Sequence, residues 1–339
     1  SMSDVDSGTE ETVRNISFYG RINYSYDSRY MLQATIRRDG SSVSGTNHRW
    51  GTFPSVSAAW NISEEDFMKG SIFDQLKLRL GYGVSGNALG FGAYSAVATY
   101  GLDANSSFQY DGETYYKLVA TKNANPDLKW ESTGMFNVGL DFAFLNSRLS
   151  GSIEFYNKKT TDLIWNYPVS TNIYPYGEMN ANVGDITNTG IELTINAVPV
   201  QTKNFRWNTT LNLSHNKNKV NKLSNSTYAV KYRDWGDPRI AGISSNGEVE
   251  RIMEGEALGT FWTYEWAGYN QNGQSQFYVH DPETGERTGE LTTDPKESDK
   301  TKVGSALPKL TYGWNNTLSY KNWSLTAFFQ GNIGNKIMN

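Results

Sequence analysis

Residues 16–37 read ISFYGRINYSYDSRYMLQATIR, and this stretch decides the fold. Apolar residues recur at every second position on both sides of residues 27–29, and polar residues such as Arg21 and Arg37 take most of the positions between them. A period of two is typical of a strand with one apolar and one polar face. The stretch therefore predicts a β-hairpin that turns at residues 27–29.

The same alternation recurs along the chain and predicts ten strands. They are residues 16–26, 30–37, 55–62, 75–82, 136–144, 149–155, 191–197, 205–213, 310–320 and 323–330. We expect one antiparallel sheet in which each strand pairs with the next. We also expect an apolar set (Ile16, Phe18, Leu32, Leu78, Val138, Ile153, Leu193, Leu211 and Leu325) to face lipid, and a polar set (Arg37, Arg79, Glu154, Glu192 and Arg206) to face a lumen.

The connections between these strands alternate strictly in length. The short ones are residues 27–29, 63–74 (where one helical turn is expected), 145–148, 199–204 and 321–322. The long ones are residues 39–53, 85–130, 158–190 and 214–309. Every long loop then lies at the same end of the sheet, which is typical of outer-membrane barrels with short periplasmic turns and long extracellular loops.

The composition agrees with a barrel wall and excludes several other classes. The 339 residues include 14% aromatics, which argues against disorder, and no cysteine, which excludes a disulfide scaffold and thiolate chemistry. The net charge of −4 leaves no basic footprint for nucleic acid. The mean hydropathy of −0.58 resembles that of a soluble protein, but a wall that alternates lipid-facing and lumen-facing residues has the same average.

Aromatic residues gather at the predicted strand ends beside the short turns. Tyr24, Tyr26 and Tyr30 flank one turn, and Tyr320 and Trp323 flank another. This placement predicts an aromatic girdle at a membrane interface. The alternative is the general enrichment of aromatics in strands.

Several segments resemble the SusC/RagA family of TonB-dependent outer-membrane transporters. They include residues 30–42 (YMLQATIRRDGSS), 49–60 (RWGTFPSVSAAW), 125–131 (NPDLKWE), 182–192 (NVGDITNTGIE) and 308–313 (PKLTYG). The resemblance implies an all-β, antiparallel, up-and-down transmembrane barrel of about 22 strands around a plug, multi-pass in the bacterial outer membrane. It also implies a SusD-like surface lipoprotein as a lid, energy from the TonB complex, and an oligosaccharide or peptide as the solute.

Parts of the family pattern are not found in residues 1–339. The plug domain, the N-terminal region that would meet the TonB complex and the closing C-terminal strands are not seen. We therefore expect residues 1–14 to form a loop and residues 15–339 to be an internal segment of about ten strands from the larger barrel.

Enzyme chemistry is poorly supported by the sequence. His48, His215 and His280 do not stand at metal-ligand or catalytic spacing, and the acidic run from Asp281 to Glu286 lacks the spacing of a Ca²⁺ loop. We expect a non-enzyme without metal or cofactor, and a solvated loop over residues 280–302. The alternatives are an outer-membrane barrel hydrolase and a soluble β-rich carbohydrate-binding module, although the second does not explain the loop asymmetry.

Two aromatic loop segments are the candidate contact sites. Aromatic faces stack on sugar rings and pack on protein partners, or the loops pack on themselves. The candidates are Trp165, Tyr167, Tyr174 and Tyr176 in one loop and Tyr100, Phe108, Tyr110, Tyr115 and Tyr116 in another. A basic set is expected to face the lumen and to meet the plug or the solute: Arg21, Arg37, Lys77, Arg79 and Arg206.

Overall fold

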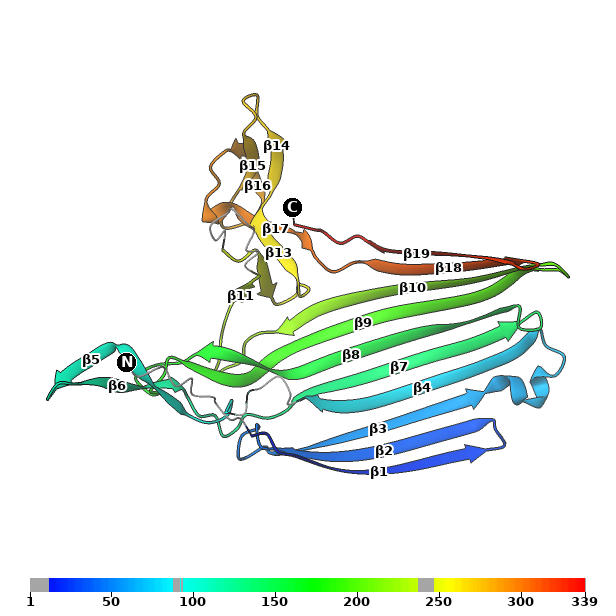
Figure 1. Ribbon diagram of the computed structural model, residues 1–339, viewed down its shortest axis with the longest axis horizontal. Helices are drawn as coiled ribbons and strands as arrows, with labels where there is room; N and C mark the ends of the chain where they lie inside the picture. Colours follow the sequence, from blue (N-terminus) through cyan, green and yellow to red (C-terminus); the bar gives the residue numbers. More distant parts are fainter. Residues whose placement is uncertain (1–11, 88–91, 93, 237–246, 339) are drawn as a thin grey trace.

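A computed structural model describes residues 12–87, 92, 94–236 and 247–338, and its main feature is one antiparallel sheet of ten strands (Figure 1). The strands follow each other across the sheet in sequence order. They are β1 Asn15–Tyr26, β2 Tyr30–Ser41, β3 Trp50–Asn61, β4 Phe73–Asn87, β7 Glu131–Phe144, β8 Leu149–Pro168, β9 Glu178–Gln201, β10 Phe205–Lys222, β18 Leu310–Tyr320 and β19 Trp323–Ile333. The ten predicted strands and their up-and-down order are confirmed.

The pairing register keeps the apolar and polar faces of this sheet separate. Leu32 lies beside Ala58, and Ala58 lies beside Leu80. Leu80 in turn lies beside Val138, so these side chains share one side of the sheet, the apolar face. The opposite side is the polar face. Apolar side chains such as Phe18, which is 64% exposed, are left open on the apolar face, as they are in a single membrane-facing wall and not in a sandwich of two packed sheets.

The prediction of a long loop over residues 158–190 is wrong. β8 continues to Pro168 and β9 begins at Glu178, so only residues 169–177 connect them. The register shifts between Thr160 and Leu163, and Asp162 has a left-handed φ of 59°, which together mark a β-bulge. A bulge resets the two-residue alternation, and this is why the sequence pattern stops before the strands do.

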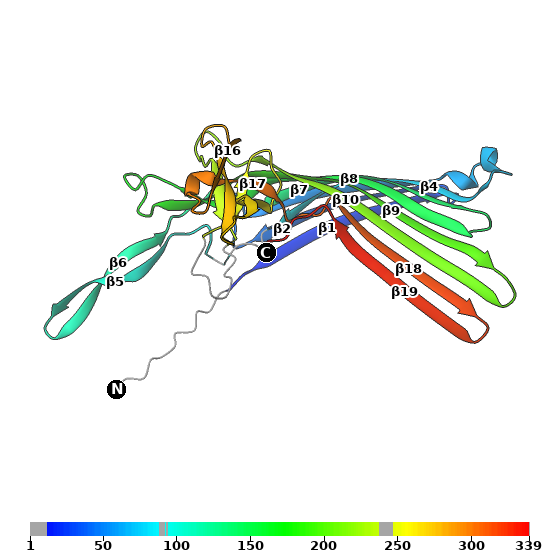
Figure 2. The same ribbon diagram turned by 90° about the horizontal axis from the view of Figure 1, so that it is seen from above.

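The other long connections also contain strands. Residues 85–130 hold a separate hairpin, β5 Thr99–Tyr110 and β6 Glu113–Lys122, which projects from the sheet (Figure 2). The connection at residues 39–53 shortens to 42–49, and that at 214–309 shortens because β10 reaches Lys222.

Two small sheets and a short helix occupy the last long connection. One sheet contains β11 Tyr232–Trp235, β12 Glu250–Met253, β13 Thr260–Tyr264 and β17 Lys300–Ser305, the other contains β14 Trp266–Tyr269, β15 Ser275–His280 and β16 Arg287–Thr292, and η3 is Glu297–Asp299. Residues 270–274 form the turn of the β14–β15 hairpin. Residues 280–302 are mostly exposed, as expected, but they are not a plain loop, because they contain β16 and the start of β17.

Buried side chains are concentrated at the long-loop end of the molecule. Two buried clusters lie there, Tyr167 with Ala181 and Val183, and Ile186 with Val220 and Leu223. Trp165 and Val230 pack against both clusters. The extended ends of β8, β9 and β10 therefore fold against the following loop and give this end a core of its own.

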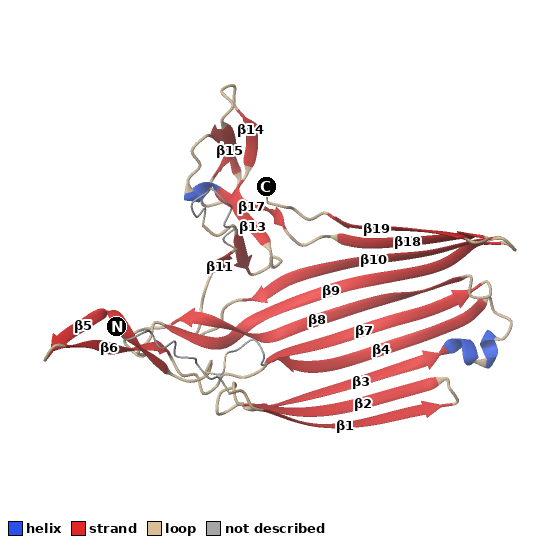
Figure 3. Ribbon diagram, in the orientation of Figure 1, coloured by secondary structure: helices blue, strands red, loops and turns tan. Residues whose placement is uncertain are grey.

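The short connections at the opposite end are tight. Asp27 and Ser28 both have left-handed φ values, 52° and 55°, as in the two-residue turns that fit the twist of a hairpin. Two 3₁₀ turns, η1 Ile62–Glu64 and η2 Asp66–Met68, stand where one helical turn was expected (Figure 3). Among the described residues, no helix is long and apolar enough to cross a membrane.

Candidate functional site

The polar face brings together the five basic residues that the sequence singled out. Arg21 lies on β1, Arg37 on β2, Lys77 and Arg79 on β4, and Arg206 on β10. The register of the intervening strands places all five on the same side of the sheet. The predicted polar set is thus continuous across the wall.

Arg79 joins three strands on this face. Its Nε and Nη2 atoms donate to the two carboxylate oxygens of Asp141 on β7 at 2.9 and 3.0 Å, and Nη2 also donates to Glu154 on β8 at 3.3 Å. Asn137 donates to the other oxygen of Glu154. The guanidinium lies over Gly139, where a Cβ would meet Nη2 at 2.7 Å. The fork geometry matches two carboxylates, so Arg79 acts as a brace within the wall.

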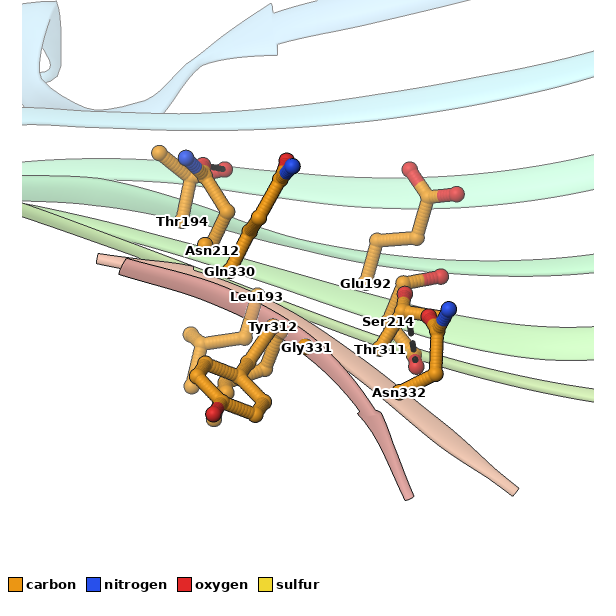
Figure 4. A pocket seen from close by; sticks show the side chains of 12 residues that line it. Glu192, Leu193, Thr194, Asn212, Ser214, Thr311, Tyr312, Gln330, Gly331 and Asn332 are labelled. Atoms are coloured by element: carbon orange, nitrogen blue, oxygen red, sulfur yellow. Dashed lines mark hydrogen bonds between the residues drawn. The ribbon is translucent and has the colours of Figure 1, made fainter. Parts of the chain in front are cut away.

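A polar hollow of about 570 Å³ opens where β9, β10, β18 and β19 meet (Figure 4). Glu192, Asn212, Thr311 and Gln330 line it, and Gly313 leaves room at its base. A Cβ on Gly313 would meet only the Phe328 ring at 3.7 Å. The lining offers amides, hydroxyls and one carboxylate, which suit hydrogen bonding to a polar molecule and provide no nucleophile–base pair.

Glu192 has an unusual position at this hollow. In the register it lies directly beside Glu154, a like charge on the same face. Glu154 is paired with Arg79, whereas no salt bridge joins Glu192 to any described residue. Two carboxylates side by side repel each other, so a positive or hydrogen-bonding group opposite Glu192 would stabilise it.

The aromatic residues of the predicted 158–190 loop separate into two groups. Tyr167 is fully buried and Trp165 is packed against the buried clusters, with the Arg233 guanidinium over both rings at 4.9 and 5.4 Å. Tyr174 and Tyr176 lie in the connection after β8, and Tyr176 is exposed. Trp165 and Tyr167 therefore pack within the protein, as in the alternative that the loops pack on themselves.

The aromatic residues of the other segment remain open. Tyr100, Phe108, Tyr110, Tyr115 and Tyr116 all lie on the β5–β6 hairpin and are exposed. Phe108 and Tyr115 stack with ring centroids 5.4 Å apart. An isolated two-stranded hairpin is marginally stable in water, so a surface that covers these rings would stabilise it.

Three asparagines that sequence reasoning did not single out hold the long-loop end together. Asn123 donates to the backbone carbonyls of Tyr176 and Glu178, and Asn125 donates to that of Asn180. The side chain of Asn182 accepts from the backbone N–H of Lys129 and donates to the carbonyl of the same residue. The motifs at 125–131 and 182–192 therefore face each other. The asparagines are visible in these two motifs of the sequence, but their spacing does not show which two segments lie against each other.

The small sheets carry a charged cluster around Glu265. Arg287 Nη2 and Nε lie 2.5 and 3.0 Å from its carboxylate, and His280 Nε2 lies 3.2 Å away. The hydrogen bond from Arg287 lowers the pKa of Glu265 below its usual value. His280 is buried, and its Nδ1 has no hydrogen-bond partner among the described residues.

The histidines do not converge on a reactive centre. His48 is exposed in residues 42–49, and His215 Nδ1 contacts the carbonyl of Lys309. In the part of the chain that the structure describes, no group of three or more histidine or acidic side chains is placed to hold a metal ion.

One curved sheet with sequential antiparallel strands, long loops at one end and an open apolar face defines the wall of an outer-membrane β-barrel. The chain belongs to the TonB-dependent receptor-like β-barrel family, whose model, described as "TonB dependent receptor-like, beta-barrel", matches residues 2–335. It is an outer-membrane protein, and it is similar to SusC and to the RagAB transporter. The soluble carbohydrate-binding module is thereby excluded.

Curated relatives and solved structures agree with this family. TonB-dependent receptor SusC of Bacteroides thetaiotaomicron is 35% identical over 95% of this chain and 31% of its own length. TonB-dependent receptor P3 of Formosa agariphila is 33% identical over 96% of the chain and 32% of its length. The RagAB peptide transporter superposes with a TM-score of 0.77 at 26% identity, over 95% of this chain and 34% of that one. The chain thus spans about a third of these relatives.

Proposed function

We propose that this chain forms part of the wall of an active outer-membrane importer for oligosaccharides or peptides. A SusD-like surface lipoprotein would close the long-loop end as a lid. The TonB complex would supply energy through a region outside residues 1–339. The RagAB structure is a peptide transporter and SusC is a TonB-dependent receptor, which supports the class and a peptide as one solute, while the oligosaccharide rests on the resemblance found in the sequence.

The observation that carries this proposal is the continuous polar face on a wall of this family. Arg21, Arg37, Lys77, Arg79 and Arg206 would line the lumen on this face, with the hollow beside Glu192 among them. Lumen-facing amides, hydroxyls and charges would let a hydrated solute or the plug slide past without burying unpaired polar groups.

The β5–β6 hairpin is the best-supported contact for solute or lid. Its five aromatic side chains are exposed within this chain, and among the residues that the structure describes nothing covers them. Tyr174 and Tyr176 are a second contact of the same kind. Trp165 and Tyr167 would act indirectly, by fixing the rim from which these groups project.

We further propose that the chain performs no covalent chemistry. Of the three histidines, His280 has a carboxylate partner in Glu265, but its side chain is only 4% exposed and lies within a small sheet. A hydrolase would need an accessible histidine beside a nucleophile at the barrel rim. The barrel hydrolase therefore has no specific support among the described residues.

The test replaces Phe108, Tyr110 and Tyr115 together with serine in the full-length transporter. Each stacked aromatic contributes about 0.5–1.5 kcal/mol beyond area burial, so uptake or lid docking should fall about tenfold or more. The measurements are growth on the cognate solute, co-purification of the lipoprotein, and the amount of barrel at the cell surface.

A matched control is Tyr269→Ser, which removes a similarly exposed aromatic (68%) from the β14–β15 hairpin. We expect the control to keep uptake and docking. If the triple serine variant is present at normal surface levels with unchanged uptake and unchanged docking, the solute and lid sites lie elsewhere.

A further inference from the structure

The segment between β3 and β4 stands apart from the other short connections. It contains η1 and η2, and it extends beyond the ends of β1, β2 and β3 at the short-turn end of the sheet (Figure 1). Its side chains Phe67 and Ile72 are 70% and 76% exposed. Large apolar side chains that reach past the end of a barrel wall need a surface to cover them.

Glu65 fastens this segment to the apolar face of the sheet. Trp60 Nε1 donates to its Oε1 at 3.1 Å, the Tyr30 hydroxyl donates to the same oxygen, and Arg29 lies 3.4 Å from Oε2. Tyr30 and Trp60 are register partners in the same row as Leu78, so they belong to the apolar face. The segment is therefore held on the outer, lipid-facing side of the wall, where the aromatic girdle ends.

Most charges of the segment are paired, either within it or with the neighbouring β1–β2 turn. Lys69 lies 2.7 Å from Asp66, and Glu65 is paired with Arg29. Asp74 accepts a hydrogen bond from the backbone of Ser147 on the adjacent turn. Charges that already have partners cost less to place near a medium of low dielectric constant.

An apolar hollow of about 360 Å³ opens beside the anchor on the same face. Tyr24, Leu32, Ala58, Leu78 and Leu80 are among its lining residues, with Trp60 and Tyr30 at its edge. Ala58 is small, and the larger side chains around it make the recess. A recess of this kind is continuous with the lipid-facing wall and suits an acyl chain.

We propose that residues 62–72 form an interfacial foot that places Phe67 and Ile72 in the phospholipid of the periplasmic leaflet. The occupant is lipid because the foot continues the apolar face, lies on its outer side, and begins just after Trp60, the register partner of the predicted girdle residue Tyr30. The polar side chains Glu64 and Lys69 would point to the aqueous side. The foot would set how deep this side of the barrel sits in the membrane.

The test is site-directed spin labelling of the full-length protein in nanodiscs of phosphatidylethanolamine and phosphatidylglycerol. This chain has no native cysteine, so single labels can be placed here at Phe67→Cys or Ile72→Cys, with Lys69→Cys and Glu64→Cys as controls in the same segment. All four positions are exposed, so the substitutions should not disturb the fold. Collisions with oxygen report lipid, and collisions with a neutral nickel chelate report water.

We expect labels at positions 67 and 72 to be several-fold more accessible to oxygen than to the chelate, and those at 64 and 69 to show the reverse. Equal chelate access at all four positions would place the segment in water and overturn the proposal. Immobile labels at 67 and 72 that neither reagent reaches would show a protein partner, which also overturns it.

Discussion

The hydroxyl of Tyr167 donates a 2.9 Å hydrogen bond to the backbone carbonyl of Leu223, which follows it by 56 residues. The bond joins the extended end of β8 to the loop after β10, and both residues are fully buried. Tyr167, which the sequence analysis named as a candidate contact residue, therefore joins two segments of the long-loop end.

Tyr167→Phe removes this tie without changing the shape of the ring. The buried carbonyl of Leu223 loses its partner, which costs about 1–3 kcal/mol. Amide hydrogen exchange of residues 223–230 should become roughly tenfold faster. Tyr176→Phe, at an exposed position, should leave this exchange unchanged. Equal protection in both variants would mean that the bond does not hold the loop.

Gly45 lies where residues 42–49 come into close contact with the segment around Pro126 and Leu128. Its N–H donates to the Leu128 carbonyl at 2.7 Å, and a Cβ at this position would lie 2.1 Å from the backbone oxygen of Pro126. Backbone cannot move aside as a flexible side chain can. Gly45→Ala should release residues 42–49, and trypsin should then cleave after Arg49 much faster. Gly20→Ala, where nothing lies within 4 Å, is the control and should leave cleavage at the wild-type rate.

Gly313→Phe fills the polar hollow beside Glu192. The position is open on the polar face, so the barrel should still assemble and keep its heat-modifiable mobility on gels. Under the proposed function, uptake of the solute should fall because the ring obstructs the lumen. The matched variant Gly20→Phe also puts a ring on the ten-stranded sheet, but on the apolar face, and should transport normally. Unimpaired uptake by Gly313→Phe would remove the hollow from the solute path.

The Glu265 cluster should make the small sheets sensitive to acid. Because Arg287 holds the pKa of Glu265 below its ordinary value of 4.5, the carboxylate contributes stability that is fully present above that value. The contribution is lost as the pH falls through the lower pKa of the folded state. Pepsin cleavage within residues 275–292, divided by the rate on an unfolded substrate at the same pH, should therefore rise as the pH falls below 4.5. Glu265→Gln should be cleaved faster than the wild type above pH 4.5, and its normalised cleavage rate should lack this pH dependence.

Alternation predicted the ten strands because each strand exposes one face to an apolar surrounding and one to polar groups. Leu32, Leu80 and Val138 fall in one row in the structure as they did in the pattern. The pattern failed at the long-loop end, where the bulge at Asp162 shifts the register and both faces of β9 meet protein. Periodicity carries no information once both sides of a strand are packed.

The candidate site was predictable in part for the same reason. The position of the basic residues on the polar face follows from the two-residue alternation of side chains along each strand. The difference between Trp165 and Phe108, one packed and one open, depends on contacts with distant segments such as the loop of Arg233. Asn182 was quoted only as a motif residue, because a side chain that bonds the backbone of Lys129 has no local signature.

The strands in the middle of the ten-stranded sheet are much longer than those at its β1 edge. β9 has 24 residues and β8 has 20, whereas β1 to β3 have 12 each. At about 3.3 Å per residue, the 12 extra residues of β9 add roughly 40 Å of strand, which is divided between its two ends (Figure 1). Under the proposed function, the extended ends of β8 and β9 would form a raised wall beside the entrance, against which an arriving solute would be held.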